Sequence, residues 1–257
     1  MFTLPNEPQT IGRVLDQGFR LYATGLKRVL PLTVIIGLTG LLFGLYTTSF
    51  QTNPGAIQPG PGFGLAVIVY MLTTLWLWTA VILRYDSVAG GLPRSVGQAL
   101  GRGLAKLLPV AVASVVYFVA LIVGTLLLIV PGIILSLSLL FFIYAIALDN
   151  AGPMSGLSRS HKLVWGNWWR TAAAIAVPYV IVFALTLAVQ LPMMLPMAAG
   201  GDPQSFLIWT RIGEALVNIF IAPMSAAFGL VIYHDLKLRK QGADLESRMA
   251  AGEPVTE

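Results

Sequence analysis

Long apolar runs constrain what this chain can fold into more than any other feature. A helix needs about 20 predominantly apolar residues to cross the hydrocarbon core of a bilayer. Hydrophobic residues make up 56% of the sequence and charged residues only 11%, which is too little charge to cover a water-soluble surface. The sequence therefore predicts an all-α, polytopic membrane protein with six transmembrane helices, at about residues 30–50, 63–83, 107–130, 133–148, 171–190 and 211–233.

The fourth of these spans, over 133–148, is the weakest. At the rise of an α-helix it reaches only about 24 Å, whereas the hydrocarbon core is about 30 Å thick. The third and fourth spans form a hairpin that we expect to turn at "VPG" (130–132). Two alternatives stay open for this hairpin: it crosses the membrane fully, or it enters and leaves on the same side.

Basic residues are distributed unevenly between the connecting segments. The loops at 51–62, 130–132 and 192–206 contain no Lys or Arg, and 15 of the 16 basic residues of the chain lie on the other side of the spans. Lys and Arg near span ends are retained on the cytoplasmic side. We therefore expect one membrane domain over residues 1–234 in a bacterial inner membrane, with both termini cytoplasmic and a cytoplasmic tail over 235–257.

A weak internal repeat precedes each of the three predicted hairpins. "VLDQGFRLYATGLKR" (14–28) aligns with "GLSRSHKLVWGNWWR" (156–170), and "SVGQALGRGLAKLLP" (95–109) is a shorter copy. In the first copy apolar and basic residues fall on opposite faces of a helix, which is typical of helices that lie along a membrane surface. We expect such interfacial amphipathic helices at about 11–28, 95–106 and 153–168.

The basic faces of these helices are candidate contacts for anionic lipid headgroups on the cytoplasmic side. We expect Val14 and Phe19 in the acyl boundary, and Trp165, Trp168 and Trp169 at headgroup depth, where indole rings collect. Anchoring in the membrane without a specific ligand explains the same pattern, so a specific lipid or partner site is the alternative interpretation. The candidate headgroup contacts are Arg13, Arg20, Lys27, Arg28, Arg159, Lys162 and Arg170.

The sixth span contains a polar stripe. Arg211, Glu214, Asn218 and Ser225 follow one another at spacings of 3, 4 and 7 residues, which puts them on one helical face. Ionisable groups at membrane depth usually face a bundle interior or a wet cavity. These four residues are therefore a candidate intramembrane polar site. In the alternative interpretation, Arg211 and Glu214 lie in the outer headgroup layer and pair with each other.

The sequence offers no constellation for catalysis. It contains no HExxH, no GxSxG, no phosphate-cradling glycine loop and no cysteine. His161 and His234 would suit zinc together with Asp149 and Asp235, but no spacing brings these four together. We therefore expect no enzyme activity, no cofactor and no metal. Because the basic residues follow the membrane edge, we also expect no nucleic-acid partner.

Three stretches resemble a bacterial multi-pass membrane protein family of unknown function. "YHDLKLRKQGADLE" (233–246) is similar to the ending of that family, "TIGRVLDQGFRLY" (10–22) to its start, and residues 130–170 to its central block. The family is similar to YciC-like membrane proteins and to the membrane domain of some glycerophosphodiester phosphodiesterases. His234 and Gln241 depart from its pattern. The resemblance implies membrane residence and a link to lipids, without hydrolase activity because the catalytic domain is absent.

Two functional hypotheses follow. The first is a non-enzymatic integral inner-membrane protein with an accessory, scaffold or membrane-homeostasis role. The alternative is a transporter or lipid-handling protein with its polar site on the sixth span. Inverted repeats are typical of transporters, and the three copies here share one orientation, which argues mildly for the first hypothesis.

Overall fold

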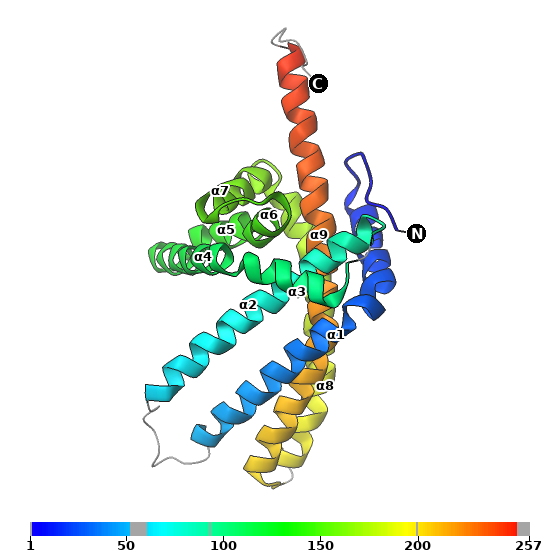
Figure 1. Ribbon diagram of the computed structural model, residues 1–257. Helices are drawn as coiled ribbons and strands as arrows, with labels where there is room; N and C mark the ends of the chain where they lie inside the picture. Colours follow the sequence, from blue (N-terminus) through cyan, green and yellow to red (C-terminus); the bar gives the residue numbers. More distant parts are fainter. Residues whose placement is uncertain (1, 52–60, 93, 199, 251–257) are drawn as a thin grey trace.

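The computed structural model describes residues 2–51, 61–92, 94–198 and 200–250, and most of that length is helical (Figure 1). Six helical segments in this part of the chain are long and apolar enough to cross a membrane, which confirms the predicted all-helical, six-span composition. The helices are α1 (Ile11–Gln51), α2 (Pro61–Ala89), α3 (Val96–Ala105), α4 (Leu107–Leu127), α5 (Ile129–Leu139), α6 (Phe142–Asp149), α7 (Pro153–Val164), α8 (Trp168–Ala198) and α9 (Pro203–Ala250).

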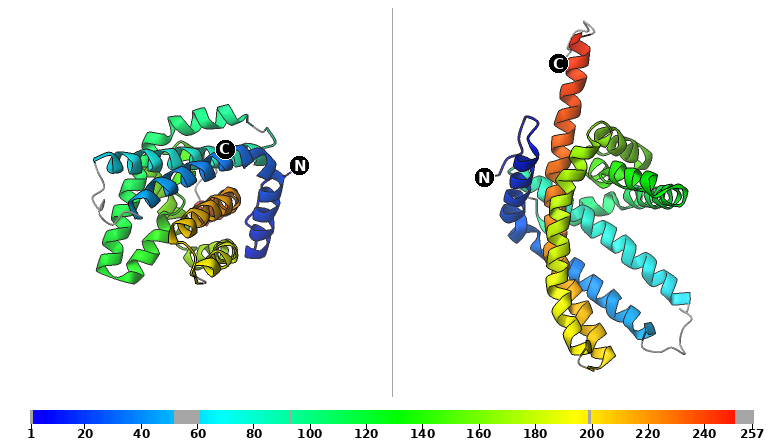
Figure 2. Two further views of the ribbon diagram at one scale, coloured as in Figure 1. Left: turned by 90° about the horizontal axis from the view of Figure 1, so that it is seen from below. Right: turned by 180° about the vertical axis from the view of Figure 1, so that it is seen from behind.

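The central helix is α9. It packs against α1, α2, α7 and α8, and α8 runs beside it (Figures 1 and 2). The second half of α1 and the first half of α2 lead away from the centre toward the same end of the molecule as the start of α9. The hairpin of α4 and α5 instead extends sideways from the core, across the direction of α8 and α9. Both alternatives for the third and fourth spans, full crossing and re-entry, stay predictions.

The α4–α5 hairpin turns earlier than the sequence predicts. Its one extended residue is Leu128, whereas the predicted turn at 130–132 already belongs to α5. Pro131 lies in the first turn of α5, where a backbone N–H has no intrahelical partner and a proline is tolerated. The two helices approach closely because both contribute a glycine: a Cβ on Gly124 would lie 3.3 Å from the Cα of Gly132.

α1 joins the first predicted interfacial helix, 11–28, to the first span, 30–50, in one continuous helix with a pronounced bend (Figures 1 and 2). Pro31 lies inside this helix, and a proline there removes one backbone hydrogen bond and kinks the axis. The side chain of Arg84 on α2 reaches the bend and donates from Nε to the carbonyl of Arg28 at 2.5 Å.

The apolar face of residues 11–28 is covered mainly by protein. Val14 is only 2% exposed and Leu21 is buried, so the prediction that Val14 lies in the acyl boundary is wrong. Gly18 lets α9 approach, because a Cβ at this position would lie 2.6 Å from the ring of Phe228. Phe19 packs edge-on against the same ring but stays 41% exposed, as a residue in contact with lipid would. The amphipathic pattern here therefore reports helix packing, and contact of this helix with a membrane surface stays a prediction.

The second predicted interfacial helix, 95–106, corresponds to α3. It begins with a capping box, in which the Ser95 hydroxyl accepts from the backbone N–H of Gln98 and the Gln98 side chain accepts from that of Ser95. α3 is attached to α2 by the indole of Trp76, which donates to the carbonyl of Leu100 at 2.8 Å.

The third predicted interfacial helix, 153–168, is interrupted. α7 ends before Gly166, whose positive φ of 90° turns the chain into α8. The hydroxyl of Ser160 on α7 is buried, donates to the carbonyl of Ser138 at 2.8 Å and accepts from the backbone N–H of Phe141 at 3.0 Å. These bonds satisfy backbone groups at the break that divides the predicted fourth span into α5 and α6.

The last helix extends beyond the predicted sixth span at both ends. It begins directly after Asp202, whose carboxylate accepts from the backbone N–H of Ser205 at 2.8 Å, as an N-cap does. At the other end the predicted tail, 235–257, continues as part of α9 as far as Ala250, and its remaining residues lie outside the described part of the chain.

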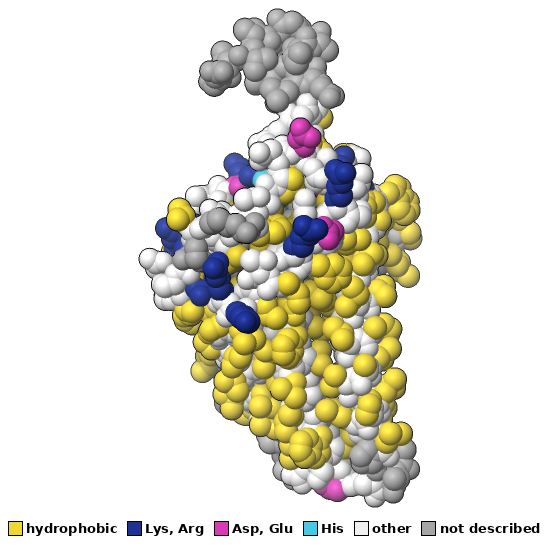
Figure 3. Space-filling model, turned by 90° about the vertical axis from the view of Figure 1, so that its right-hand side faces the viewer, with side chains coloured by type: hydrophobic (Ala, Val, Ile, Leu, Met, Phe, Trp, Pro, Cys, Tyr) yellow, Lys and Arg dark blue, Asp and Glu magenta, His cyan; other side chains and the backbone are white. Residues whose placement is uncertain are grey.

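The surface is divided by chemical type along the long axis. On the face shown in Figure 3, hydrophobic side chains cover the lower body, whereas Lys and Arg gather toward the end from which the C-terminal part of α9 emerges. We call that end the basic end.

Candidate functional site

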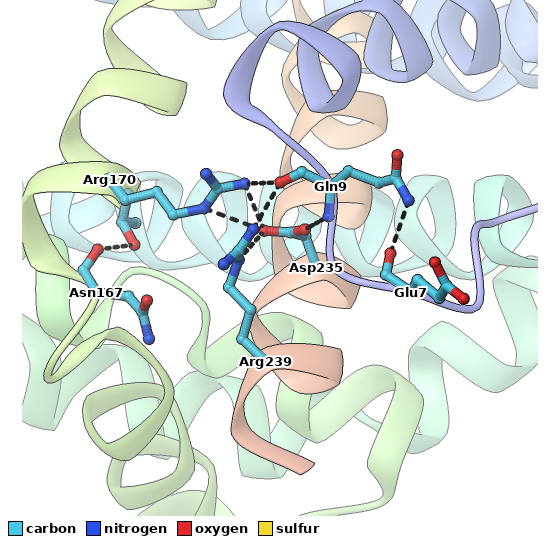
Figure 4. Close-up of polar contacts among 7 residues, drawn as sticks. Glu7, Gln9, Asn167, Arg170, Asp235 and Arg239 are labelled. Carbon is cyan, nitrogen blue, oxygen red and sulfur yellow. Dashed lines mark hydrogen bonds and ion pairs between the residues drawn. The ribbon is translucent and has the colours of Figure 1, made fainter. Parts of the chain in front are cut away.

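Asp235 of α9 lies in the basic end, between α8 and the segment that precedes α1 (Figure 4). Its side chain is only 5% exposed. One carboxylate oxygen is 3.0 Å from Nη2 of Arg170 and 3.0 Å from Nε of Arg239, and the other accepts from the backbone N–H of Gln9 at 2.7 Å. Two arginines therefore neutralise one buried carboxylate.

The same two arginines hold the chain before α1. The carbonyl of Gln9 accepts from Nη2 of Arg239 at 2.6 Å and from Nη2 of Arg170. Next to Asp235, Nε2 of the His234 ring donates a hydrogen bond of 2.8 Å to the carbonyl of Pro5. The network thus joins three segments that are far apart in the sequence. Removing one partner of a buried ion pair costs about 3–5 kcal/mol, so we expect this network to hold the three segments together.

Asp149, the last residue of α6, is the centre of a second cluster. Its Oδ2 accepts from the hydroxyl of Tyr233 at 2.7 Å, and its Oδ1 lies 2.8 Å from Nζ of Lys237. Arg159 of α7 approaches the same carboxylate at 3.5 Å. This cluster connects α6, α7 and α9.

A groove of about 260 Å³ lies beside Asp149, between α7 and α9. It differs from the Asp235 network in that two of its cations, Lys162 and Lys240, form no ion pair within the described part of the chain. Among the described lining side chains, four are basic and one is acidic. We call it the α7–α9 groove; it is lined by Asp149, Arg159, Lys162, Leu163, Tyr233, Lys237, Lys240 and Gln241.

The structure separates the predicted headgroup contacts into two groups. Arg170 is the exception to the prediction, because α8 turns its guanidinium toward α9, where it is committed to Asp235. Arg20 is exposed but pairs with Asp16 at 2.9 Å, one helical turn away. The exposed candidates are Arg13, Arg20, Lys27, Arg28, Arg159 and Lys162.

The predicted polar stripe of the sixth span is not gathered in one place. Arg211 and Glu214 form an ion pair of 3.0 Å, and the stem of Arg211 crosses α1 so closely that a Cβ on Gly44 would lie 2.8 Å from its Cδ. Asn218 is exposed on the helix surface. Ser225 lines an apolar cavity of about 230 Å³ to which the other three do not contribute.

That apolar cavity lies between α2, α4, α6, α8 and α9. Among its few polar side chains is Tyr144, whose hydroxyl donates to the carbonyl of Ala226 at 3.3 Å. The hydroxyl of Ser114, another lining residue, is bonded to the carbonyl of Val110 within its own helix. The cavity therefore presents mainly hydrocarbon to an occupant.

The two histidines lie in different surroundings. His161 packs against the indole of Trp165, with ring centroids 5.1 Å apart, and His234 contacts Pro5 as described above. Within the described residues, no three His, Cys, Asp or Glu side chains are grouped so that they could hold a metal ion.

Sequence reasoning considered Asp149 and Asp235 only as metal ligands and missed their ion pairs. The spacing of Asp235 and Arg239, four residues apart on one helix, was a readable signal for one of these pairs. The partners Arg170 and Gln9 carried no such signal, because they are 65 and 226 residues away.

A domain family, described as a domain of unknown function (DUF7847), matches residues 107–236, which is just over half of the chain. No curated protein and no solved structure matches this chain. The matched region includes Asp149, Asp235 and most of the α7–α9 groove. The finer likeness to YciC-like proteins and to phosphodiesterase membrane domains stays a prediction. By the extent of this match, the chain belongs to the DUF7847 family of unknown function.

Proposed function

We propose that this protein is a non-enzymatic, multi-pass protein of a bacterial inner membrane, with both termini in the cytoplasm and an accessory, scaffold or membrane-homeostasis role. The observation that carries the proposal is the gathering of Lys and Arg at one end of an apolar body (Figure 3). Lys and Arg next to spans face the cytoplasm, where the leaflet is anionic. On this proposal, the basic end contacts cytoplasmic lipid headgroups.

Exposed tryptophans support the same orientation. Trp165 follows α7, and Trp169, the second residue of α8, is 81% exposed. Indole rings are enriched at the membrane–water interface, where one part of the ring system is apolar and the N–H is hydrated. A lipid headgroup layer at this end would stabilise these exposed indole rings beside the basic residues.

Reporter fusions test the orientation. Fusions after Gly60 and after Gly200 should read as external, and a fusion at Glu257 as internal, because the loops carrying the first two have no Lys or Arg. An internal signal after Gly60 would overturn the proposed topology.

A lipid-handling role is the second candidate, and the apolar cavity lined by Ser225 and Tyr144 favours it. A phospholipid with a photoactivatable acyl chain should then crosslink to α6 in reconstituted protein. Ser225→Trp should fill the cavity and suppress these crosslinks, whereas Asn218→Trp, outside the cavity, should leave them unchanged. Equal crosslinking in both variants would count against this role.

A further inference from the structure

The described side chains that line the α7–α9 groove carry more positive than negative charge. Arg159 and Lys162 approach from α7, and Lys237 and Lys240 from α9, which lies beside α7 at the basic end (Figure 1). Among the described residues, Asp149 is the one carboxylate in the lining. With four cations and one anion, the described lining has a formal charge of plus three, which favours an anionic occupant.

Part of this charge is already held in place. Asp149 is bonded to Lys237 at 2.8 Å and lies 3.5 Å from Arg159, so these two cations are oriented before a ligand arrives. Preorganised groups lose less conformational entropy on binding. Tyr233 contributes to the same arrangement, because its hydroxyl donates to Asp149 at 2.7 Å and its ring is buried.

The other two cations are available to a ligand. Lys162 and Lys240 are exposed, and neither forms an ion pair or hydrogen bond within the part of the chain that the structure describes. An ammonium group binds phosphate oxygens as a strong point charge. The groove thus combines two positioned cations with two uncommitted ones around a volume of about 260 Å³.

We propose that the α7–α9 groove is a binding site for a phosphate group, carried by the headgroup of an anionic phospholipid. The inference deepens the proposed function and rests on it for the choice of lipid as the source. Trp165 stands three residues after Lys162 and is exposed, so the groove lies near an indole of the kind that marks headgroup depth. Leu163 adds an apolar side chain to the lining.

The test uses the full-length protein in nanodiscs of phosphatidylcholine that contain a small fraction of phosphatidylglycerol. Native mass spectrometry of protein released from the discs measures how much phosphatidylglycerol is retained relative to phosphatidylcholine. The variant is Lys162→Gln combined with Lys240→Gln, which leaves the Asp149 bonds intact. The matched control is Arg102→Gln combined with Lys106→Gln, which removes the same charge at the end of α3, outside the groove. Both faces of a nanodisc carry the same lipids, so the result is independent of topology.

We expect the groove variant to lose retention of phosphatidylglycerol by about tenfold or more, since on this proposal both Lys side chains form charge-assisted hydrogen bonds with the bound phosphate, which lysines outside the groove do not form. The control variant should stay within about twofold of wild type. A second arm titrates inorganic phosphate into discs of phosphatidylcholine alone: binding that the groove variant loses, without lipid retention, would keep the phosphate site and reject the lipid as its source. Equal losses in both variants, or no selective binding in either arm, would overturn the proposal.

Discussion

Asp235 and Glu214 are both carboxylates of α9 that pair with an arginine, but their surroundings differ. At the rise of a helix they are about 30 Å apart. Asp235 is 5% exposed and bonded to groups from three separate segments, whereas Glu214 is 37% exposed and pairs with Arg211 of its own helix. The comparison shows that a buried ion pair between distant segments helps to specify the tertiary structure. A partly exposed ion pair within one helix mainly satisfies its own two charges.

The largest effect should come from Asp235→Ala. This change leaves Arg170 and Arg239 without their buried carboxylate and removes the acceptor of the Gln9 N–H, so we expect a loss of about 3–5 kcal/mol in the free energy of unfolding. Reversible denaturation in mixed micelles measures it. Asp16→Ala, which removes an exposed pair with Arg20, should cost less than about 1 kcal/mol. Similar losses in the two variants would show that the Asp235 network does not join the segments.

Arg170→Gln should have a smaller effect. Asp235 keeps Arg239 as a partner, but the link from α8 to the segment before α1 is lost, so we expect a loss of about 1.5–3 kcal/mol. The control is Arg159→Gln, which removes a more exposed arginine 3.5 Å from Asp149 and should be nearly neutral. If Arg170→Gln were as mild as its control, the network would be held by Arg239 alone.

Smaller still should be the effects of Glu214→Gln and Arg211→Gln. Both side chains are partly exposed and lie three residues apart, so each single variant and the double variant should change the unfolding free energy by less than about 1 kcal/mol. Loss of several kcal/mol in each single variant, partly restored in the double, would mean that the pair is buried in the assembled membrane protein. That outcome would remove the contrast with Asp235 and revive the polar-site hypothesis for the sixth span.

The smallest expected effect is the pH dependence at Asp202. Hydrogen bonds from the N–H and hydroxyl of Ser205 lower the pKa of this carboxyl below its ordinary value of 3.8. A lowered pKa in the folded state means that stabilisation is present above the ordinary pKa and is lost as the pH falls through the lowered one. The Tm of wild type should therefore fall slightly more than that of Asp202→Ala between about pH 5 and pH 3. Parallel curves would show that the cap does not contribute.

Local sequence patterns predicted the helices well, but they predicted poorly what each helix packs against. Apolar runs located the six candidate spans because each apolar residue contributes to the free energy of transfer into lipid. That contribution does not depend on which helix the run packs against. The same pattern placed Val14 at the lipid boundary, because hydrophobic periodicity identifies the buried face of a helix without identifying what buries it. The turn residues "VPG" suggested a turn at Pro131, although proline is equally suited to the first turn of a helix, where it lies.

By itself the sequence determined the all-helical membrane class, the approximate spans and the asymmetric distribution of basic residues. These properties depend on composition and on residues that are close in the chain. The tertiary structure decided that Arg170 pairs with Asp235 instead of facing lipid, and that Lys237 and Lys240 of α9 join Arg159 and Lys162 of α7 around one groove. The reason is physical: such contacts depend on how helices cross, and crossing is set by close packing at many positions at once, such as Gly18 against Phe228.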